Sequence, residues 1–193
     1  YGQFIRQDGP TQHLTKRGTP TMGGVVIILA TVVAWLIGAL VVGAGPSWSG
    51  LLLIFLFVGL GVIGLLDDGI KIMRQRSLGL HPSGKIIGQV AVASIFALGT
   101  LIKPNEFGEY PGTLAISFAR PTAVTLGFAG LGLGIALYLI WTNLIVTAWS
   151  NATNLTDGLD GLAAGVSIFV FGAYTFITYF QRIQSCTQLG ANQ

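Results

Sequence analysis

The chain has 193 residues, of which 52% are hydrophobic and only 9% are Asp, Glu, Lys or Arg. Soluble domains carry about 25% charged residues, so this composition excludes an ordinary soluble domain and indicates a protein that is solvated by membrane lipid. The net charge of +3 bears on orientation in the membrane and on anionic lipid headgroups, and we expect no nucleic-acid partner.

Five apolar segments are long enough to cross a bilayer, because about 20 apolar residues span its hydrocarbon core as a helix. Every backbone group in lipid needs an internal hydrogen bond, and no alternating pattern of apolar residues favours a barrel. The predicted fold class is therefore all-α, a polytopic integral membrane protein. We expect one transmembrane helical bundle over residues 1–193, with spans at 23–44, 50–66, 86–102, 127–149 and 162–180.

The distribution of positive charge predicts the orientation of these spans. Three of the connecting segments fall on one side of the membrane, at 1–22, 67–85 and 150–161. They hold seven of the ten lysines and arginines, so the positive-inside rule makes this side the cytoplasmic one. Four of the seven acids then lie at the cytoplasmic boundary of the membrane: Asp67, Asp68, Asp157 and Asp160.

The first cytoplasmic segment ends in "TKRGTPTMGG", residues 15–24. On the simplest interpretation, Lys16 and Arg17 are ordinary positive charges that flank a span. Pro20 and the glycines near it also predict a rigid turn whose backbone can approach a ligand closely. Lysine and threonine side chains beside such a turn could bind a phosphate, and the residues leave both interpretations open.

Polar and small residues inside the spans favour helix packing. The pattern "GLGVIG" at 59–64 matches G-x-G-x-x-G, but a dinucleotide site needs a strand before this motif. Within a span, small residues let helices approach closely, so we predict a packing role. Three polar residues inside spans are predicted to form hydrogen bonds between helices rather than to contact ligands: Gln89, Thr142 and Asn143.

The second span ends in "LLDDGIK", residues 65–71, where Asp68 and Gly69 could simply turn the chain. However, two adjacent carboxylates repel each other, and a helix C-terminus is the negative end of the helix dipole. The pair therefore needs a positive partner, which is either Lys71 on the same helix face or a divalent cation. Mg²⁺ suits such a pair, because it binds through one or two carboxylates together with substrate phosphates.

Three polar residues recur at intervals of three in "NLTDGLDG", residues 154–161. One of the aspartates could cap the helix that we expect from Leu162. Asn154, Asp157 and Asp160 together exceed what a cap requires. On one helical or turn-like face they would hold a base, sugar hydroxyls or a metal ion, and the spacing favours this interpretation over capping.

Three motifs, "KRGTPTMGG", "GLLDDGIK" and "NATNLTDGLDGLA", occur in this order. Together they resemble the phospho-N-acetylmuramoyl-pentapeptide transferase branch of the polyprenyl-phosphate N-acetylhexosamine-1-phosphate transferase superfamily, over essentially the whole chain. The resemblance implies a Mg²⁺-dependent enzyme of the bacterial cytoplasmic membrane with a cytoplasmic active face. Undecaprenyl phosphate would attack the β-phosphate of UDP-N-acetylmuramoyl-pentapeptide, so that UMP leaves and lipid I forms for peptidoglycan synthesis.

The resemblance also implies roles for single residues. The implied catalytic residues are Asp67, Asp68 and Asp157, of which Asp67 and Asp68 are the candidate metal ligands. The implied substrate contacts are Lys16, Thr21, Lys71, Lys85, Asn154, Asp157 and Asp160. Gly69 stands where the family often has a tyrosine, and this difference would loosen the end of the second span.

Two alternatives stay open beside this interpretation. A sister transferase would use a UDP-N-acetylglucosamine-type donor. A transporter is less favoured, because its charged groups would lie near the membrane midplane, whereas the four aspartates fall at span ends. The family continues beyond this chain with another aspartate segment and a histidine-rich loop, so we expect this piece alone to be inactive. The resemblance leaves a homodimer open.

Overall fold

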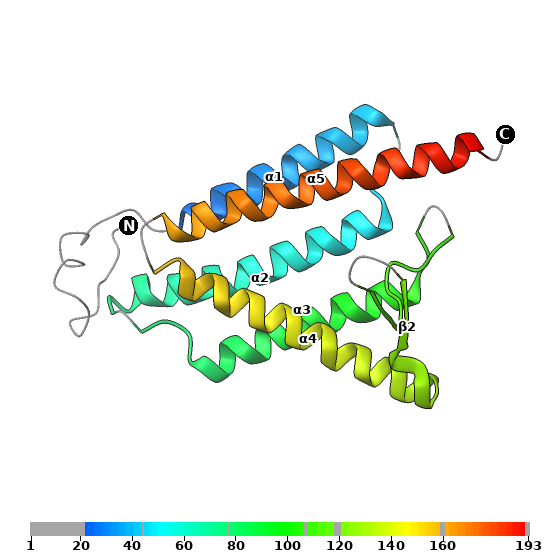
Figure 1. Cartoon of the computed structure of the whole chain (residues 1–193). Helices are drawn as coiled ribbons and strands as arrows, with labels where there is room; N and C mark the ends of the chain where they lie inside the picture. Colours follow the sequence, from blue (N-terminus) through cyan, green and yellow to red (C-terminus); the bar gives the residue numbers. More distant parts are fainter. Residues whose placement is uncertain are drawn as a thin grey trace. The chain divides into compact units, whose positions relative to one another are not determined.

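A computed structural model of the chain describes residues 22–43, 45–76, 78–105, 108–117, 121–158 and 161–191. Figure 1 shows the helices of the described part, which are α1 (Gly23–Val42), α2 (Trp48–Met73), α3 (Pro82–Ile102), α4 (Leu131–Thr156) and α5 (Leu162–Ala191). Five helices among the described residues are long and apolar enough to cross a membrane. The predicted class, an all-α polytopic membrane protein with about five spans, is confirmed. The chain divides into two compact units, 1–147 and 148–193, and each is described by itself.

α2, α3 and α5 extend beyond the apolar stretches from which they were predicted, whereas α1 ends at Val42 rather than at residue 44, and α4 runs from Leu131 to Thr156 rather than over 127–149. α2 begins after Ser47, whose hydroxyl accepts a hydrogen bond from the Gly50 N–H at 3.1 Å, and it continues past residue 66 to Met73. α3 begins at Pro82, because proline suits the first helical position, where its missing N–H costs nothing. Hydropathy marks only the lipid-crossing part of each helix, while capping and turn chemistry decide where the helix ends.

Glycines allow α2 and α3 to pack closely along their length. A methyl group on Gly59 would lie 2.7 Å from Val92 Cγ1, and one on Gly88 would lie 3.2 Å from Ile63 Cδ1. Gly61 faces α1 in the same way, since a methyl group there would overlap Ile28 Cδ1. The packing role predicted for the "GLGVIG" segment is therefore confirmed at Gly59 and Gly61.

Hydrogen bonds join α3 to the part of α4 that belongs to the first unit. The Asn143 amide Nδ2 donates to Ser94 Oγ at 3.0 Å, which confirms the interhelical role predicted for Asn143. The hydroxyls of Thr100 and Tyr138 lie 2.8 Å apart. Gln89 is buried in α3, with only 1% of its surface exposed. The hydrogen bonds of Asn143 and Thr100 fix the position of α3 along α4, which apolar packing alone would not do.

A short hairpin follows α3 and was not predicted from the sequence. β1 (Ala115–Ser117) pairs antiparallel with β2 (Pro121–Thr125), and the 3-10 turn η2 (Leu126–Ala129) leads from it into α4. The Gly112 N–H donates to the Thr100 carbonyl at 3.0 Å, so the segment that leads into β1 is tied to the end of α3. The hairpin lies beside this end of α3 in Figure 1. Strands of three and five residues are too short to leave a clear alternating pattern.

Tryptophan and lysine meet at the same end of the α2–α3 pair. Trp48 donates from Nε1 to the Gly99 carbonyl at 3.1 Å, and Lys103 Nζ lies 5.2 Å from the centre of the Trp48 ring. Tryptophan is typical of the membrane–water interface, where its ring meets lipid and its N–H finds a polar partner.

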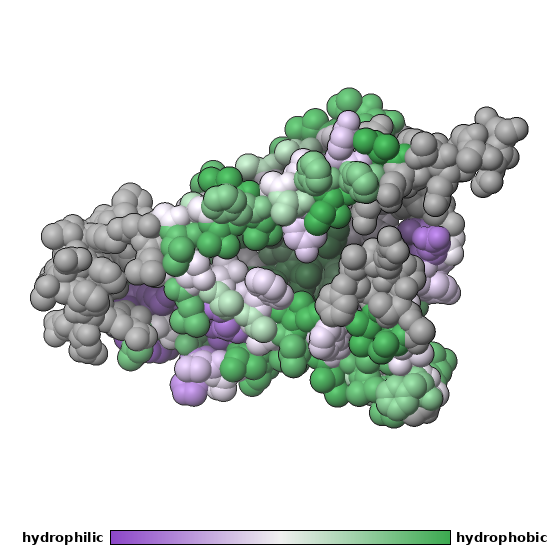
Figure 2. Space-filling model, viewed as in Figure 1, coloured by the Kyte–Doolittle hydropathy of each residue, from purple (hydrophilic) through white to green (hydrophobic). Residues whose placement is uncertain are grey.

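Large apolar side chains are exposed over the described surface, as the green areas of Figure 2 show. α1 is described throughout and buries none of its residues. A helix that is apolar on all sides needs an apolar solvent. The outer faces of these helices therefore fit contact with lipid.

Replacing Gly59 with alanine in the full-length protein will lower its thermal stability. The new methyl group would lie 2.7 Å from Val92 Cγ1, and a β-branched side chain has little freedom to move away. We expect a loss of about 1–3 kcal/mol, as is typical of an overpacked site. The midpoint of thermal unfolding in detergent measures this loss.

Gly64→Ala is the matched control for this prediction, because its methyl group would meet no described atom within 4 Å. Equal unfolding midpoints for Gly59→Ala and Gly64→Ala would contradict the close approach of α2 and α3.

Candidate functional site

The predicted acid pair lies within the last turns of α2. Asp67 and Asp68 are helical, and the helix continues through Gly69 to Met73, with the Arg74 N–H donating to the Ile70 carbonyl at 3.0 Å. The chain turn that Asp68 and Gly69 could have formed is absent from this stretch. Gly69, which stands where the family often has a tyrosine, does not interrupt the helix.

Lys71 bridges the two carboxylates. Its Nζ lies 2.6 Å from Asp67 Oδ2 and 3.0 Å from Asp68 Oδ1, at helix spacings of four and three residues. The Asp67 side chain is 17% exposed, and that of Asp68 is 39% exposed. The positive partner that the sequence analysis required is therefore present on the same helix. Without it, two carboxylates would face each other at the negative end of the helix dipole.

The second oxygen of Asp67 holds the loop that leads to α3. Asp67 Oδ1 accepts a hydrogen bond from the Leu80 N–H at 2.7 Å. Gly79 lies directly against Asp67, and a methyl group on it would be 2.7 Å from the Asp67 carbonyl oxygen and would overlap the carboxylate. Only glycine fits here. Sequence reasoning missed both Leu80 and Gly79, since no motif signals a backbone contact across thirteen residues.

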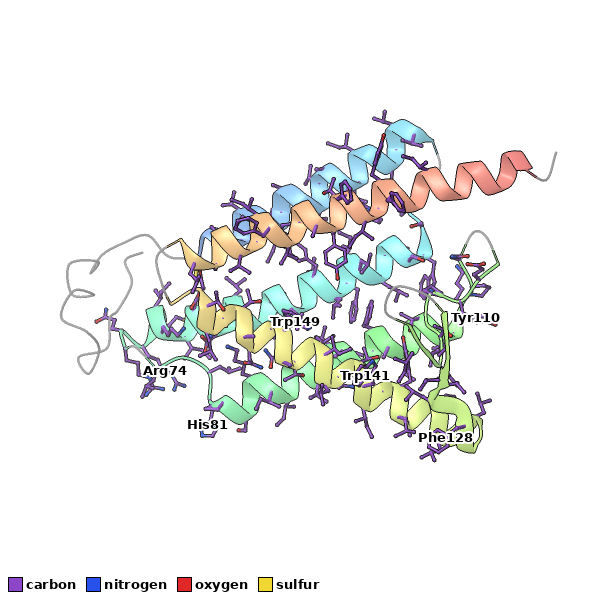
Figure 3. All side chains as sticks on the ribbon, in the orientation of Figure 1. Arg74, His81, Tyr110, Phe128, Trp141 and Trp149 are labelled. Atoms are coloured by element: carbon purple, nitrogen blue, oxygen red, sulfur yellow. The ribbon has the colours of Figure 1, made fainter. Side chains whose placement is uncertain are left out.

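Lys85 brings a second positive charge to the same place. It lies in the first turns of α3, where its N–H donates to the His81 carbonyl at 3.1 Å, and its charge acts on the Asp67 carboxylate. Figure 3 labels Arg74 and His81, at the two ends of the connection between α2 and α3. Asp67, Asp68 and Lys71 are in direct contact, and Lys85 is near enough for its charge to act on Asp67, so these four predicted site residues form one cluster.

The two carboxylates differ in their fitness to bind a cation. Among the described residues, Asp68 is contacted through Oδ1 alone, whereas both oxygens of Asp67 are engaged. The described residues contain no group of three or more His, Cys, Asp or Glu side chains that could hold a metal ion. Mg²⁺ does not require such a group, because it keeps several waters and binds through one or two carboxylates and substrate phosphates. The other oxygen of Asp68, Oδ2, can bind Mg²⁺ in this way, because Lys71 contacts Oδ1.

The predicted residues Asn154 and Asp157 belong to the second unit. Asn154 is exposed in the last turn of α4, and Asp157 follows the helix directly, with its N–H donating to the Thr153 carbonyl at 3.0 Å. Gly161 immediately precedes α5, so Asp157 does not cap that helix. Capping therefore gives no reason for an aspartate at 157. Three further predicted residues lie outside the described part of the chain: Lys16, Thr21 and Asp160.

Comparison with known proteins links these features to one family. The sequence pattern of glycosyl transferase family 4 matches residues 49–190, and signature 1 of phospho-N-acetylmuramoyl-pentapeptide-transferase matches residues 16–28. The chain is 58% identical over 189 residues to the protein of that name from Beutenbergia cavernae, covering 98% of this chain and 52% of the relative. The Micrococcus luteus protein is 53% identical, with coverage of 98% and 52%, and the Cutibacterium acnes protein is 52% identical, with coverage of 97% and 51%. The chain spans about half the length of the curated relatives it matches.

Replacing Lys71 with glutamine in the full-length protein will make its stability depend on divalent cations. The change leaves two carboxylates without their bridging ammonium, and we expect a loss of about 1 kcal/mol in cation-free buffer. Millimolar Mg²⁺ should restore most of this loss, because a cation can then replace Lys71 between the carboxylates. Thermal unfolding with and without Mg²⁺ measures the difference.

The control is Arg74→Gln, which removes the same charge from an exposed residue at the end of α2. The bridging role of Lys71 would be contradicted if both variants responded alike to Mg²⁺.

Proposed function

The chain belongs to glycosyl transferase family 4, and from this membership we propose that the whole protein makes lipid I. It transfers phospho-N-acetylmuramoyl-pentapeptide from its UDP-linked donor to undecaprenyl phosphate and releases UMP. The observation that carries the proposal is the cluster of Asp67, Asp68, Lys71 and Lys85 at the end of an apolar helix. The similarity to relatives named for this transfer supports it.

The chemistry requires two anionic phosphates to approach each other at the edge of a membrane. An oxygen of the lipid phosphate forms a bond to the β-phosphorus of the donor, and the bond from that phosphorus to the bridging oxygen breaks as UMP leaves. Positive charge lowers the repulsion and stabilises the leaving group. Lys71 and Lys85 supply that charge from the chain itself, so we propose that they contact the substrate phosphates.

A general base contributes little to this reaction. A phosphate monoester has a second pKa of about 6, so the attacking lipid phosphate is already largely dianionic at neutral pH. The carboxylates therefore serve positioning and charge placement, and little covalent work is left to the protein. We assign Asp68 the role next to the reacting groups because its side chain is 39% exposed, against 17% for Asp67, and Lys71 contacts only its Oδ1.

Mg²⁺ is part of the proposal, with Asp68 as the residue of this chain that would hold it. When bound, it would neutralise charge on the phosphates. Asp157 and Asn154 are proposed to hold the uridine and diphosphate part of the donor, together with Asp160, Lys16 and Thr21. The exposure of Asn154 and Asp157 at the end of α4 supports this role, because a soluble nucleotide can reach them.

The alternative donor is a UDP-N-acetylglucosamine-type compound. The match of residues 16–28 to the muramoyl-pentapeptide signature favours the first donor. We further propose that the cluster faces the cytoplasm, where UDP-linked sugars occur. The excess of lysine and arginine in the segments on that side supports this orientation.

The full-length protein in detergent should release UMP from UDP-N-acetylmuramoyl-pentapeptide when undecaprenyl phosphate and Mg²⁺ are present. Asp68→Asn should lower kcat about 100-fold or more, because the change removes a charge that acts on the reacting phosphates. A coupled assay for UMP measures both. Residues 1–193 alone, as a control, should give no UMP.

Replacement of the donor by UDP-N-acetylglucosamine tests the alternative. Faster UMP release from that donor than from the muramoyl-pentapeptide compound would overturn the proposed substrate.

Labelling of single cysteines in intact cells tests the orientation. In a background where Cys186 and every other cysteine of the full-length protein are replaced by serine, a membrane-impermeant maleimide should label Tyr110→Cys, in the segment that follows α3. It should not label Arg76→Cys or Thr153→Cys until the membrane is permeabilised. All three positions are exposed in the structure. Labelling of position 76 or 153 from outside would place that segment away from the cytoplasm and end the proposal of a cytoplasmic site.

A further inference from the structure

We infer that Asp67 is a positioning residue, which holds the α2–α3 loop and through it Lys85, and that Asp68 is the carboxylate of the pair that meets cation and phosphate. The inference deepens the proposed function and rests on it for the role of Lys85. We name the contacts of Asp67 with Lys71, Gly79 and Leu80 the Asp67 latch.

The contacts of Asp67 leave it poorly placed to bind a ligand. Its Oδ1 accepts from the Leu80 N–H at 2.7 Å, and its Oδ2 lies 2.6 Å from Lys71 Nζ. A hydrogen bond between charged groups is about twice as strong as a neutral one, so a cation would have to displace Lys71 from Oδ2. Asp67 is also the less exposed of the pair, at 17% against 39% for Asp68.

Gly79 shows that the loop is built around Asp67. The loop backbone approaches so closely that a side chain at 79 would collide with both the carbonyl and the carboxylate of Asp67. The chain continues from Leu80 to His81 and into α3 at Pro82. Lys85 follows within the first turns of α3, and its charge acts on Asp67.

The latch therefore links the end of α2 to the start of α3. Asp68 and Lys71 stand on the first helix, and Lys85 stands on the second. Because Asp67 fixes the loop between them, it also fixes where Lys85 lies relative to Asp68. A change of about 1 Å in such a placement is large for a transfer that depends on positioning.

Two substitutions in the full-length protein break the latch from opposite sides. Asp67→Asn is nearly isosteric and removes the charge that binds Lys71, while Gly79→Ala changes no charge and displaces the loop. Gly84→Ala is the matched control, because its methyl group would meet Leu80 Cγ at 3.6 Å, an ordinary contact.

Hydrogen exchange of the Leu80 amide reports on the latch without any substrate. Exchange should be about tenfold faster in Gly79→Ala than in the wild type or in Gly84→Ala, because the amide loses its acceptor. Wild-type exchange in Gly79→Ala would overturn the inference. Asp67→Asn gives the same reading if Gly79→Ala does not fold, because an uncharged acceptor holds the amide more weakly.

Binding of Mn²⁺ alone, followed by its electron spin resonance signal, separates the two carboxylates. Asp68→Asn should weaken binding about tenfold or more, whereas Asp67→Asn should change it by less than about threefold. Equal weakening by the two substitutions would make Asp67 a ligand and overturn the inference.

The effect on Lys85 is tested by the KM for the UDP-linked donor, which a smaller fraction of folded enzyme would not change. Gly79→Ala and Lys85→Met should each raise this KM, by about tenfold for the loss of a charged contact to phosphate. If the latch acts through Lys85, the double variant should raise it no further than Lys85→Met alone. Additive effects would overturn the positioning role.

A failure of the proposed function gives a different result. No UMP would then be released from either donor, while the Leu80 exchange and the Mn²⁺ binding would still follow the pattern expected for the latch.

Discussion

The fold places two neighbouring carboxylates at the end of an apolar helix, with the ammonium group of Lys71 between them as their shared counter-charge. The ammonium group is 2.6 Å from Asp67 and 3.0 Å from Asp68. It offsets both their mutual repulsion and the negative end of the helix dipole. With this charge in place, α2 continues to Met73 and carries the pair beyond the apolar stretch that spans the membrane. The loop and the start of α3, which carries Lys85, are arranged around this bridged pair.

The packing of α2 against α3 gives this cluster a firm base. At Gly59, Gly88 and Gly99, the missing side chain makes room for an apolar residue of the other helix. Such interlocking fixes how far one helix can slide along the other. The position of Lys85 relative to Asp68 therefore depends on contacts along the whole helix pair as well as on the loop. Apolar side chains in lipid contribute little net attraction between helices, so close approach through glycines has a larger role here than in a soluble protein.

The membrane spans and the partner of the acid pair were predictable from the sequence, whereas the loop contact of Asp67 and the hairpin were not. Spans are predictable because lipid demands long apolar runs, and Lys71 was predictable because helix geometry brings residues three and four apart together. The contact of Asp67 with Leu80 was not, because it depends on the path of a loop rather than on a repeating pattern. The hairpin after α3 escaped prediction because its strands are so short. Asn154 and Asp157 were proposed as substrate contacts from their residue types and spacing, and their relation to the acid pair stays a prediction.

The Trp48 and Lys103 contact has a consequence for the depth of the cluster in the membrane. Asp67 lies nineteen positions after Trp48 in one continuous helix, which corresponds to a length of about 29 Å. The hydrocarbon core is about 30 Å thick. If the indole ring lies among the headgroups of one leaflet, the length of α2 places the two carboxylates among the headgroups of the other leaflet. The phosphate of the proposed polyprenyl phosphate acceptor would lie at this level, so it could reach the acid pair without leaving the headgroup layer.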